Sequence, residues 1–212
     1  MIKFSTATEA FVFYYDYILA YGVERGGTTA CFNMAFQLDN PMDNKICASF
    51  RKWPESYAIA EWEWYMSGDR SVAEIKKKAK IWDNMHNGDD LVWSNYGYWW
   101  KHNDQLNKII DMLKKNPETR RAVISHYDPC KLDYFTKDTP CNLILNFYIH
   151  AGKLNLSVFA RSVDLWFGFC NDQYTFSLLL KYVANMLHCD IGIIYYTITD
   201  FHIYHKHKNK KA

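Results

Sequence analysis

The sequence lacks several features that would assign it to a common class. None of its six cysteines forms a Cys-x-x-Cys pair, which leaves zinc ribbons and thioredoxin-type motifs unsupported. Lysine and arginine (25) nearly balance aspartate and glutamate (23), so bulk charge does not indicate nucleic acid or a membrane as a partner. The longest apolar stretch, residues 174–187, is too short to span a bilayer and contains Lys181. The first residues carry no signal-peptide pattern, so we expect reduced thiols and a cytoplasmic protein.

Aromatic side chains are abundant, at 17% of the chain, within a hydrophobic fraction of 49%. This content suits a large core, and it also suits a stacking pocket or a subunit interface. The 212 residues contain no repeat and no Pro/Gly-rich linker. The sequence therefore predicts one domain over residues 1–212, with a basic C-terminal tail over about residues 205–212 that we expect to be frayed.

Hydrophobic periodicity predicts alternating helices and strands. The expected helices cover residues 8–21, 54–66, 71–80, 103–115 and 172–189. The expected strands cover residues 30–38, 121–127, 142–150, 153–161 and 191–204, and residues 82–100 have the composition of a loop. This order predicts an α/β (α+β layered) domain, a mixed β-sheet flanked by helices.

Several residues could have a catalytic or binding role, although an ordinary structural role could also explain each of them. Cys141 opens a strand, and a cysteine there is more often a small buried hydrophobe than a nucleophile. Glu61 lies on an otherwise apolar helix face, where a buried carboxylate needs a partner or a function. Arg120-Arg121 is either a solvated pair or a fork for a phosphate. Asn171-Asp172 could simply cap the helix that follows.

The order of the motifs is more specific than any one of them, and over nearly the whole chain it resembles the thymidylate synthase superfamily. The matching segments are, in sequence order, Arg25-Gly-Gly-Thr, Glu61-Trp-Glu-Trp-Tyr with Gly68-Asp69, Ile81-Trp82-Asp83, Asn95-Tyr96-Gly97, Asn116-Pro117-Glu118-Thr119-Arg120-Arg121, Pro140-Cys141, Arg161-Ser162-x-Asp164, Phe167-Gly168 and Asp200-x-His202-x-Tyr204.

The resemblance implies a folate-dependent one-carbon transfer to C5 of a pyrimidine nucleotide. Cys141 would then be the nucleophile that adds to C6 of the ring. Because a free thiol is mostly protonated at neutral pH, a cation should lower its pKa, and Arg161 is the candidate. Glu61 would organise water and move protons, and Tyr96 would assist proton removal from C5. The co-substrate would be 5,10-methylenetetrahydrofolate, with no metal.

The remaining contacts implied by the resemblance surround the nucleotide. Arg25, Arg120, Arg121 and Arg161 would form a phosphate cage to which Ser162 adds a hydroxyl, and His202 with Tyr204 would hold the 3′-hydroxyl. Trp82 and Asp164 would face the folate, and Asp164 and Asn171 are also expected to contact the substrate. In the family the paired arginines reach across a two-fold interface, so Arg120 and Arg121 predict a homodimer that associates through the sheet and has composite sites.

The base is indicated by one position. In thymidylate synthases an asparagine reads uracil, donating to O4 and accepting from N3–H. Aligned from Arg161, that position falls on Asp172, whose carboxyl group would accept from the 4-amino group of cytosine, while a proton on Asp172 or on N3 satisfies the second contact. The change resembles deoxycytidylate hydroxymethylases of DNA phages. The implied product is 5-hydroxymethyl-dCMP, formed when water traps the exocyclic methylene, in the cytoplasm of an infected host.

Three alternatives stay open at this point. If Asn171 is the true equivalent and Asp172 only caps a helix, the enzyme would act on dUMP, as a synthase or a hydroxymethylase. A non-catalytic nucleotide-binding or RNA-binding protein on the same scaffold is a further alternative, against which the presence of Cys141 argues. The spacing His202-x-x-His205-x-His207 could suggest a metal, but the sugar contact and the basic tail account for it better.

The chain also departs from the synthase pattern. Ala160 stands where glutamine is common, Asn142 follows the nucleophile where histidine is common, and Pro54 replaces a histidine that contacts folate. The sequence ends soon after Tyr204, where synthases continue with a tail that closes over the folate. We therefore expect a site that is more open to water.

Overall fold

A computed structural model describes residues 1–86, 88–134 and 137–211. Its α-helices are α1 (Ala7–Tyr21), α2 (Glu55–Ser67), α3 (Tyr96–Lys101), α4 (Gln105–Lys115) and α5 (Cys170–Leu187). Its strands are β1 (Ile2–Phe4), β2 (Val23–Arg25), β3 (Thr28–Leu38), β4 (Val123–Ser125), β5 (Asn142–His150), β6 (Lys153–Asp164) and β7 (Asp190–Tyr204). Short 3-10 turns and one π-helical turn, Leu165–Phe169, connect them.

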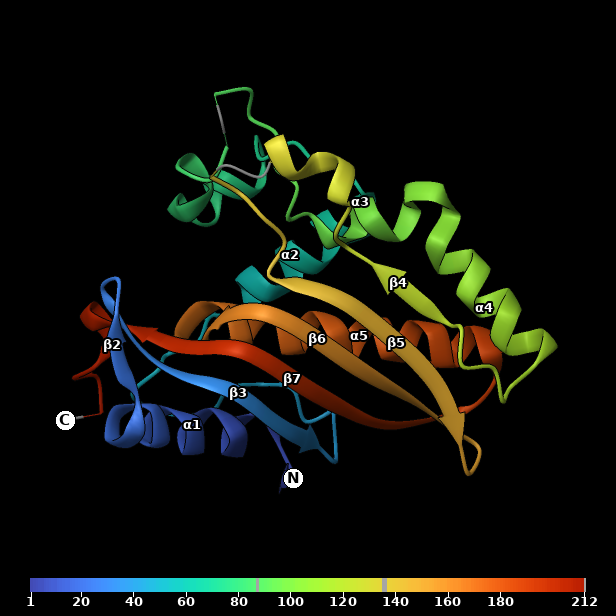
Figure 1. Ribbon diagram of the computed structural model, residues 1–212, viewed down its shortest axis with the longest axis horizontal. Helices are drawn as coiled ribbons and strands as arrows, with labels where there is room; N and C mark the ends of the chain where they lie inside the picture. The colour runs from blue at the N-terminus through green and yellow to red at the C-terminus, as the bar shows by residue number, and fades with distance from the viewer. Residues whose placement is uncertain (87, 135–136, 212) are drawn as a thin grey trace.

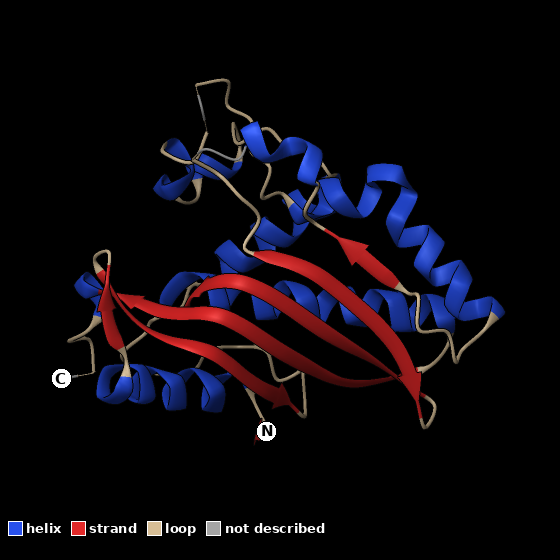
Figure 2. Cartoon of the chain, in the orientation of Figure 1, coloured by secondary structure: helices blue, strands red, loops and turns tan. Residues whose placement is uncertain are grey.

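The strands form one sheet, and helices flank it (Figures 1 and 2). The strand order is β1-β3-β7-β6-β5-β4, with β2 paired to the edge of β3. The pairs β3–β7 and β5–β6 are antiparallel, whereas β6–β7 is parallel because α5 connects these two strands. The predicted mixed α/β architecture is therefore confirmed.

Helix α1 illustrates how the sequence defines an element. The Thr6 hydroxyl accepts a hydrogen bond from the backbone N–H of Glu9, which caps the start of the helix. The helix ends at Gly22, whose N–H donates to the carbonyl of Ile18. The face that carries Phe11 is fully buried, and the side chains of Phe11 and its neighbours on that face belong to the main core. This burial fixes α1 against the sheet.

Helix α5 is the central element of the core. It runs behind strands β5, β6 and β7 in Figure 1, and most of its residues are buried. Large side chains remain exposed on the strands themselves, among them Phe32, Ile144 and Phe159. Since a lone sheet face normally alternates apolar residues inward and polar residues outward, this open face has an unusual apolar content.

The alternation of buried and open positions shifts by one residue at the same level of three adjacent strands. In β7 the buried positions change from even to odd numbers between Ile198 and Phe201, and in β6 the same change occurs between Ala160 and Val163. Ala160 and Ile198 are register partners, and β3 has Asn33 at a φ of 56° at this level. Such irregularities redirect side chains. They place the polar residues at the ends of β6 and β7 on the face away from Phe201.

Three expectations differ from the structure. The segment 71–80 forms the 3-10 turn Ile75–Lys77 instead of a continuous helix, and α3 lies within the stretch 82–100 that was expected to be loop. The tail is packed rather than frayed over its described residues: the ring of His207 stacks on Trp166, with centroids 4.8 Å apart, and the Tyr15 hydroxyl donates to the His207 carbonyl at 2.8 Å. Stacking on a core tryptophan supplies the contacts that a basic composition does not reveal.

Candidate active site

A cavity of about 180 Å³ lies where α2, the start of β5 and the start of α5 meet. It brings together seven residues that the sequence predicted for the site. These are Glu61, Trp82, Tyr96, Cys141, Asp164, Asn171 and Asp172. A cavity of this size accommodates a single heteroaromatic ring, whereas complete small-molecule sites are larger, about 300–1,000 Å³.

The thiol of Cys141 and the guanidinium of Arg161 face each other at the entrance. Arg161 Nη2 lies 3.8 Å from Cys141 Sγ, and the same group donates to the carbonyls of Thr139 and Pro140 at 2.8 and 3.0 Å. These bonds hold the guanidinium beside the sulfur. Burial nevertheless raises the pKa of the Cys141 thiol to about 11, and Arg161 only offsets part of this effect. Arg161 thus lowers the pKa of the thiol as expected, but burial, which the sequence did not reveal, outweighs this effect.

Asp172 enters the cavity from the first turn of α5. Its Oδ2 accepts a hydrogen bond from Asn142 Nδ2 at 2.8 Å, and the same nitrogen lies 2.8 Å from the hydroxyl of Tyr96. Burial, with a smaller effect from the nearby Asp164, raises the pKa of Asp172 to about 7, against the lowering effect of the Asn142 hydrogen bond. A carboxyl group in this position can change its protonation state near neutral pH.

Glu61 is buried on α2, and its carboxyl group ends a short chain of hydrogen bonds. The hydroxyl of Tyr57 donates to Glu61 Oε1 at 2.6 Å and accepts from Trp82 Nε1 at 2.9 Å. Glu61 Oε2 has no hydrogen-bond partner within the described part of the chain. Burial raises the pKa of Glu61 to about 8, so the carboxyl group is suited to hold and release a proton.

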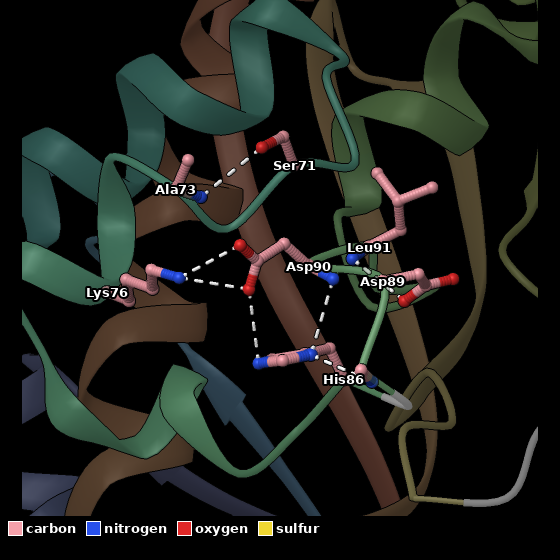
Figure 3. A network of polar contacts seen from close by, with 8 residues as sticks. Ser71, Ala73, Lys76, His86, Asp89, Asp90 and Leu91 are labelled. Atoms are coloured by element: carbon pink, nitrogen blue, oxygen red, sulfur yellow. Dashed lines mark hydrogen bonds and ion pairs between the residues drawn. The ribbon is translucent and has the colours of Figure 1, made fainter.

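The loop that carries Trp82 is held by a polar network (Figure 3). Lys76 Nζ donates to both oxygens of Asp90 at 2.9 and 3.0 Å, and His86 Nε2 lies 3.3 Å from Asp90 Oδ1. A bridge between Ser71 and Leu91 closes the base of the loop. The network therefore positions the wall of the cavity to which Trp82 belongs.

A second group of predicted residues lies next to the cavity, around the C-terminal ends of the central strands β6 and β7. Arg25 Nη1 is 3.3 Å from Asp200 Oδ2, and the other oxygen of Asp200 is 2.9 Å from His202 Nδ1. Ser162 and Asp200 are register partners, as are Asp164 and His202. Tyr204 follows on the same strand, with its ring 5.3 Å from that of His202. The strands β6 and β7 thus align these predicted contacts in one row.

A sequence model of the family described as thymidylate synthase matches residues 16–211. The chain belongs to the thymidylate synthase family. Membership indicates folate-dependent one-carbon transfer to a pyrimidine nucleotide, with methylenetetrahydrofolate as the co-substrate. The described residues contain no cluster of three or more His, Cys, Asp and Glu side chains placed to hold a metal ion. Within the same residues, no helix is long and apolar enough to cross a membrane.

Two predicted residues of this thymidylate synthase family member lie apart from both the cavity and the row of residues on β6 and β7. Arg120 and Arg121 are exposed and lie between α4 and β4. Arg120 lines a separate open hollow of about 530 Å³ together with Asn146, Tyr148 and His150 of β5. Members of the family are typically dimeric, and this exposed location agrees with a role toward a second copy of the chain.

Three residues of the site were missed by sequence reasoning. Tyr57 bonds to Glu61, Asn142 bonds to Asp172, and Asp138 accepts from the Ser94 backbone N–H at 2.9 Å, which ties the loop before Cys141 to the loop before Tyr96. Two signals were available: the adjacency of Asn142 to Cys141, and the i,i+4 spacing that sets Tyr57 beside Glu61 on the predicted helix 54–66. Asp138 gave no signal, because its partner Ser94 is 44 positions away in the sequence.

Proposed function

We propose that this protein transfers a one-carbon unit to dCMP, converting dCMP, 5,10-methylenetetrahydrofolate and water to 5-hydroxymethyl-dCMP and tetrahydrofolate. The observation that supports this substrate is the buried carboxyl group of Asp172 in the same cavity as Cys141. A protonated carboxyl group offers one acceptor and one donor, the complement of the amino group and N3 of cytosine. An ionised carboxylate would oppose the O4 lone pairs of uracil.

Asn171 is the other candidate for reading the base. It also lines the cavity, but its Oδ1 accepts a hydrogen bond from Trp53 Nε1 at 2.8 Å. This contact uses one of the two lone pairs of the carbonyl that would have to accept from N3–H of uracil, and it orients the amide toward Trp53. Asp172 has no such competing donor on Oδ1 among the contacts of the described chain. The hydrogen bonds therefore favour Asp172 as the base-reading residue and Asn171 as a residue that supports the substrate.

The reaction would start with the Cys141 sulfur. Cys141 Sγ, as thiolate, adds to C6, and the electron pair released to C5 attacks the one-carbon unit of the co-substrate. Tyr96 assists loss of the C5 proton, and Glu61 moves a proton as tetrahydrofolate departs. Water then adds to the exocyclic methylene, the carbon–sulfur bond breaks, and the ring is restored. Because water supplies the oxygen, tetrahydrofolate is not oxidised.

The co-substrate would bind at the outer side of the cavity. Trp82 forms part of the wall, and Ile81 and Phe167 leave apolar surface exposed at the rim. Flat aromatic and apolar surfaces suit the pterin ring of a folate. Asp164 faces the same region, where both of its oxygens already accept backbone N–H groups of the next turn, at 3.0 Å each. We assign Trp82 and Asp164 to the folate on this basis.

The functional unit would be a homodimer formed by the open faces of two sheets. Phe32, Ile144 and Phe159 supply exposed apolar area on that face. In the dimer, Arg120 and Arg121 of each chain would contribute to the phosphate site of the partner, where Arg25, Arg161 and Ser162 also bind. His202 and Tyr204 would contact the 3′ side of the sugar.

Product analysis by mass spectrometry tests this function. The protein is incubated with methylenetetrahydrofolate and either dCMP or dUMP. A gain of one hydroxymethyl group on dCMP alone is expected. A methyl gain on dUMP with formation of dihydrofolate would instead identify a thymidylate synthase, and a hydroxymethyl gain on dUMP would identify the second dUMP-directed alternative.

Two substitutions sharpen the test. Asp172→Asn should lower kcat/KM for dCMP by about 10²-fold or more and produce turnover of dUMP, because an amide presents the donor that O4 requires. Cys141→Ala should abolish product while nucleotide binding is retained. Unaltered activity of Cys141→Ala would contradict the mechanism, and binding without turnover by the native protein would favour the non-catalytic alternative.

A further inference from the structure

Asn142 connects two residues assigned to the reaction. It opens β5 directly after Cys141 and is completely buried. Its amide nitrogen lies 2.8 Å from Asp172 Oδ2 and 2.8 Å from the Tyr96 hydroxyl. A primary amide carries two hydrogens, so one donor can serve each acceptor. The amide oxygen of Asn142 has no partner within the described residues, which is a costly arrangement for a buried polar atom.

The backbone of Asn142 is fixed by a neutral histidine. Trp100 Nε1, which can only donate, lies 3.0 Å from His126 Nε2. His126 Nε2 is therefore the acceptor, and the ring hydrogen resides on Nδ1, which donates to the Asn142 carbonyl at 2.8 Å. Burial lowers the pKa of His126 to about 4, so this tautomer persists over the neutral range. The hydrogen bond from His126 to the Asn142 carbonyl thus fixes the backbone from which the Asn142 side chain donates.

The two oxygens of Asp172 are consequently not equivalent. Oδ2 accepts a hydrogen from Asn142, and protonation of this oxygen would weaken that bond, because a carboxylic hydroxyl oxygen is a poorer acceptor than a carbonyl oxygen. We propose that Asn142 confines the proton of Asp172 to Oδ1, and that this makes the site select a 4-amino over a 4-oxo pyrimidine. The inference rests on the proposed function, in which Asp172 reads the base.

The ring geometry relates this proton to selectivity. In a pyrimidine, C4 lies between C5 and N3. Since Oδ2 shares the Asn142 nitrogen with Tyr96, the residue assigned to C5, Oδ2 is the oxygen on the C4 side. As an acceptor it receives the 4-amino group of cytosine, and Oδ1–H donates to N3. With uracil, O4 would face a lone pair and N3–H would face a hydrogen.

Other groups near Asp172 do not distinguish its oxygens. The titratable side chains that interact with it electrostatically come from several elements around the cavity, and all are carboxyls, phenols or a thiol: Glu61, Tyr57 and Tyr65 of α2, Tyr96 of α3, Cys141, Asp164 of β6 and Tyr196 of β7. When ionised, each of them favours a protonated Asp172 without choosing an oxygen. The choice comes from the directional bond of Asn142.

The test compares Asn142→Leu, which keeps the size and removes the donor, with Asn142→His, which restores a ring N–H. The exposed Asn185 of α5 provides a matched control, Asn185→Leu. Affinities for dCMP and dUMP are measured by calorimetry, which does not require turnover. The ratio of the two affinities should fall about tenfold or more in Asn142→Leu, recover in part in Asn142→His and stay unchanged in Asn185→Leu.

A titration of Asp172 supplies a second readout. In protein labelled with ¹³C at aspartate carboxyls, the Asp172 signal is assigned by its loss in Asp172→Asn. Its pKa should rise by about one unit in Asn142→Leu, because the bond that favours the ionised form is gone. Asn142→Ala replaces Asn142→Leu if the leucine variant does not fold. If the native protein prefers dCMP and the variant keeps that preference, the inference is wrong and the proposed function stands. A native preference for dUMP would overturn both.

Discussion

The guanidinium of Arg161 lies 3.8 Å from the sulfur of Cys141, and yet the pKa of the thiol lies above its ordinary value. Burial raises the pKa of Cys141 to about 11 against the opposing effect of Arg161. The contact therefore offsets part of the cost of burying a charged sulfur, but it does not produce a thiolate at neutral pH. The sulfur should be a weak nucleophile before a substrate binds, and it should gain reactivity when a bound substrate changes its surroundings.

Alkylation by iodoacetamide tests this relationship. Cys141 should react slowly at pH 7, and its rate should rise about tenfold per pH unit up to at least pH 9, because only the thiolate reacts. Arg161→Leu should slow the reaction at pH 9 several-fold further. The exposed Cys130 is the internal control, since its rate should be the same in both proteins when peptides are quantified by mass spectrometry. A Cys141 that reacts faster than Cys130 at pH 7 would contradict the assignment.

Glu61 predicts a pH-dependent stability. Its folded-state pKa is raised to about 8, above that of the unfolded chain, so its contribution to stability is fully present below about pH 4 and is lost as the pH rises through 8. Glu61→Gln is neutral at every pH. Relative to the native protein, this variant should gain about 2–4 kcal/mol in free energy of unfolding between pH 5 and pH 8.

Urea denaturation at both pH values measures this difference. Asp172, whose pKa is also raised, is present in both proteins and cancels to a first approximation. A constant difference between native and Glu61→Gln at pH 5 and pH 8 would show that the carboxyl group is not held neutral.

Subunit complementation tests the composite site. The double variant Arg120→Ala/Arg121→Ala and the variant Cys141→Ala should each lose at least 10²-fold in activity as homodimers. After unfolding and refolding together in equal amounts, about half of the dimers are mixed and each has one intact site of two, so about a quarter of native activity should return. Failure of the mixture to regain activity would place the two arginines in the site of their own chain.

The loop network predicts an effect limited to the co-substrate. Asp90→Asn removes the charge that Lys76 and His86 share in Figure 3, and it should raise the KM for methylenetetrahydrofolate several-fold while leaving dCMP affinity unchanged. Glu74→Gln is the control, since it removes an exposed pair with Lys77 on the same segment. An equal rise of KM in both variants would indicate a general loss of order in the loop.

The sequence was sufficient for the architecture because β5, β6, β7 and α5 are apolar segments of strand or helix length bounded by polar or turn residues. It was sufficient to nominate candidate residues, because their motif order resembles that of one family. It failed over residues 71–80, where lysine-rich composition resembles an exposed helix but only a 3-10 turn at Ile75–Lys77 forms. The stretch leads into the loop held by Asp90, and that tertiary contact overrides local propensity.

Contacts between elements could not be predicted from one sequence. The bond from Asn142 to Asp172 joins residues 30 positions apart, and that from Asp138 to Ser94 joins residues 44 apart. The net pKa of Cys141 was also beyond reach, because burial is a property of the packed site and not of neighbouring residues. The sequence identified which side chains could react, but the pKa shifts of those side chains could be assessed only from the structure.

The shift of alternation in β6 and β7 has a consequence for how this chain tolerates change. If strict alternation continued past Ile198, Asp200 and His202 would point into the core and Phe201 would point out. Asp200 and His202 therefore face away from the core because one extra residue lies between the buried Ile198 and Phe201, near Thr199. This is a property of the number of residues and not of any side chain. Substitutions at this position should be mild, whereas deletion of a single residue should exchange the two faces of the strand and eliminate folding and activity together.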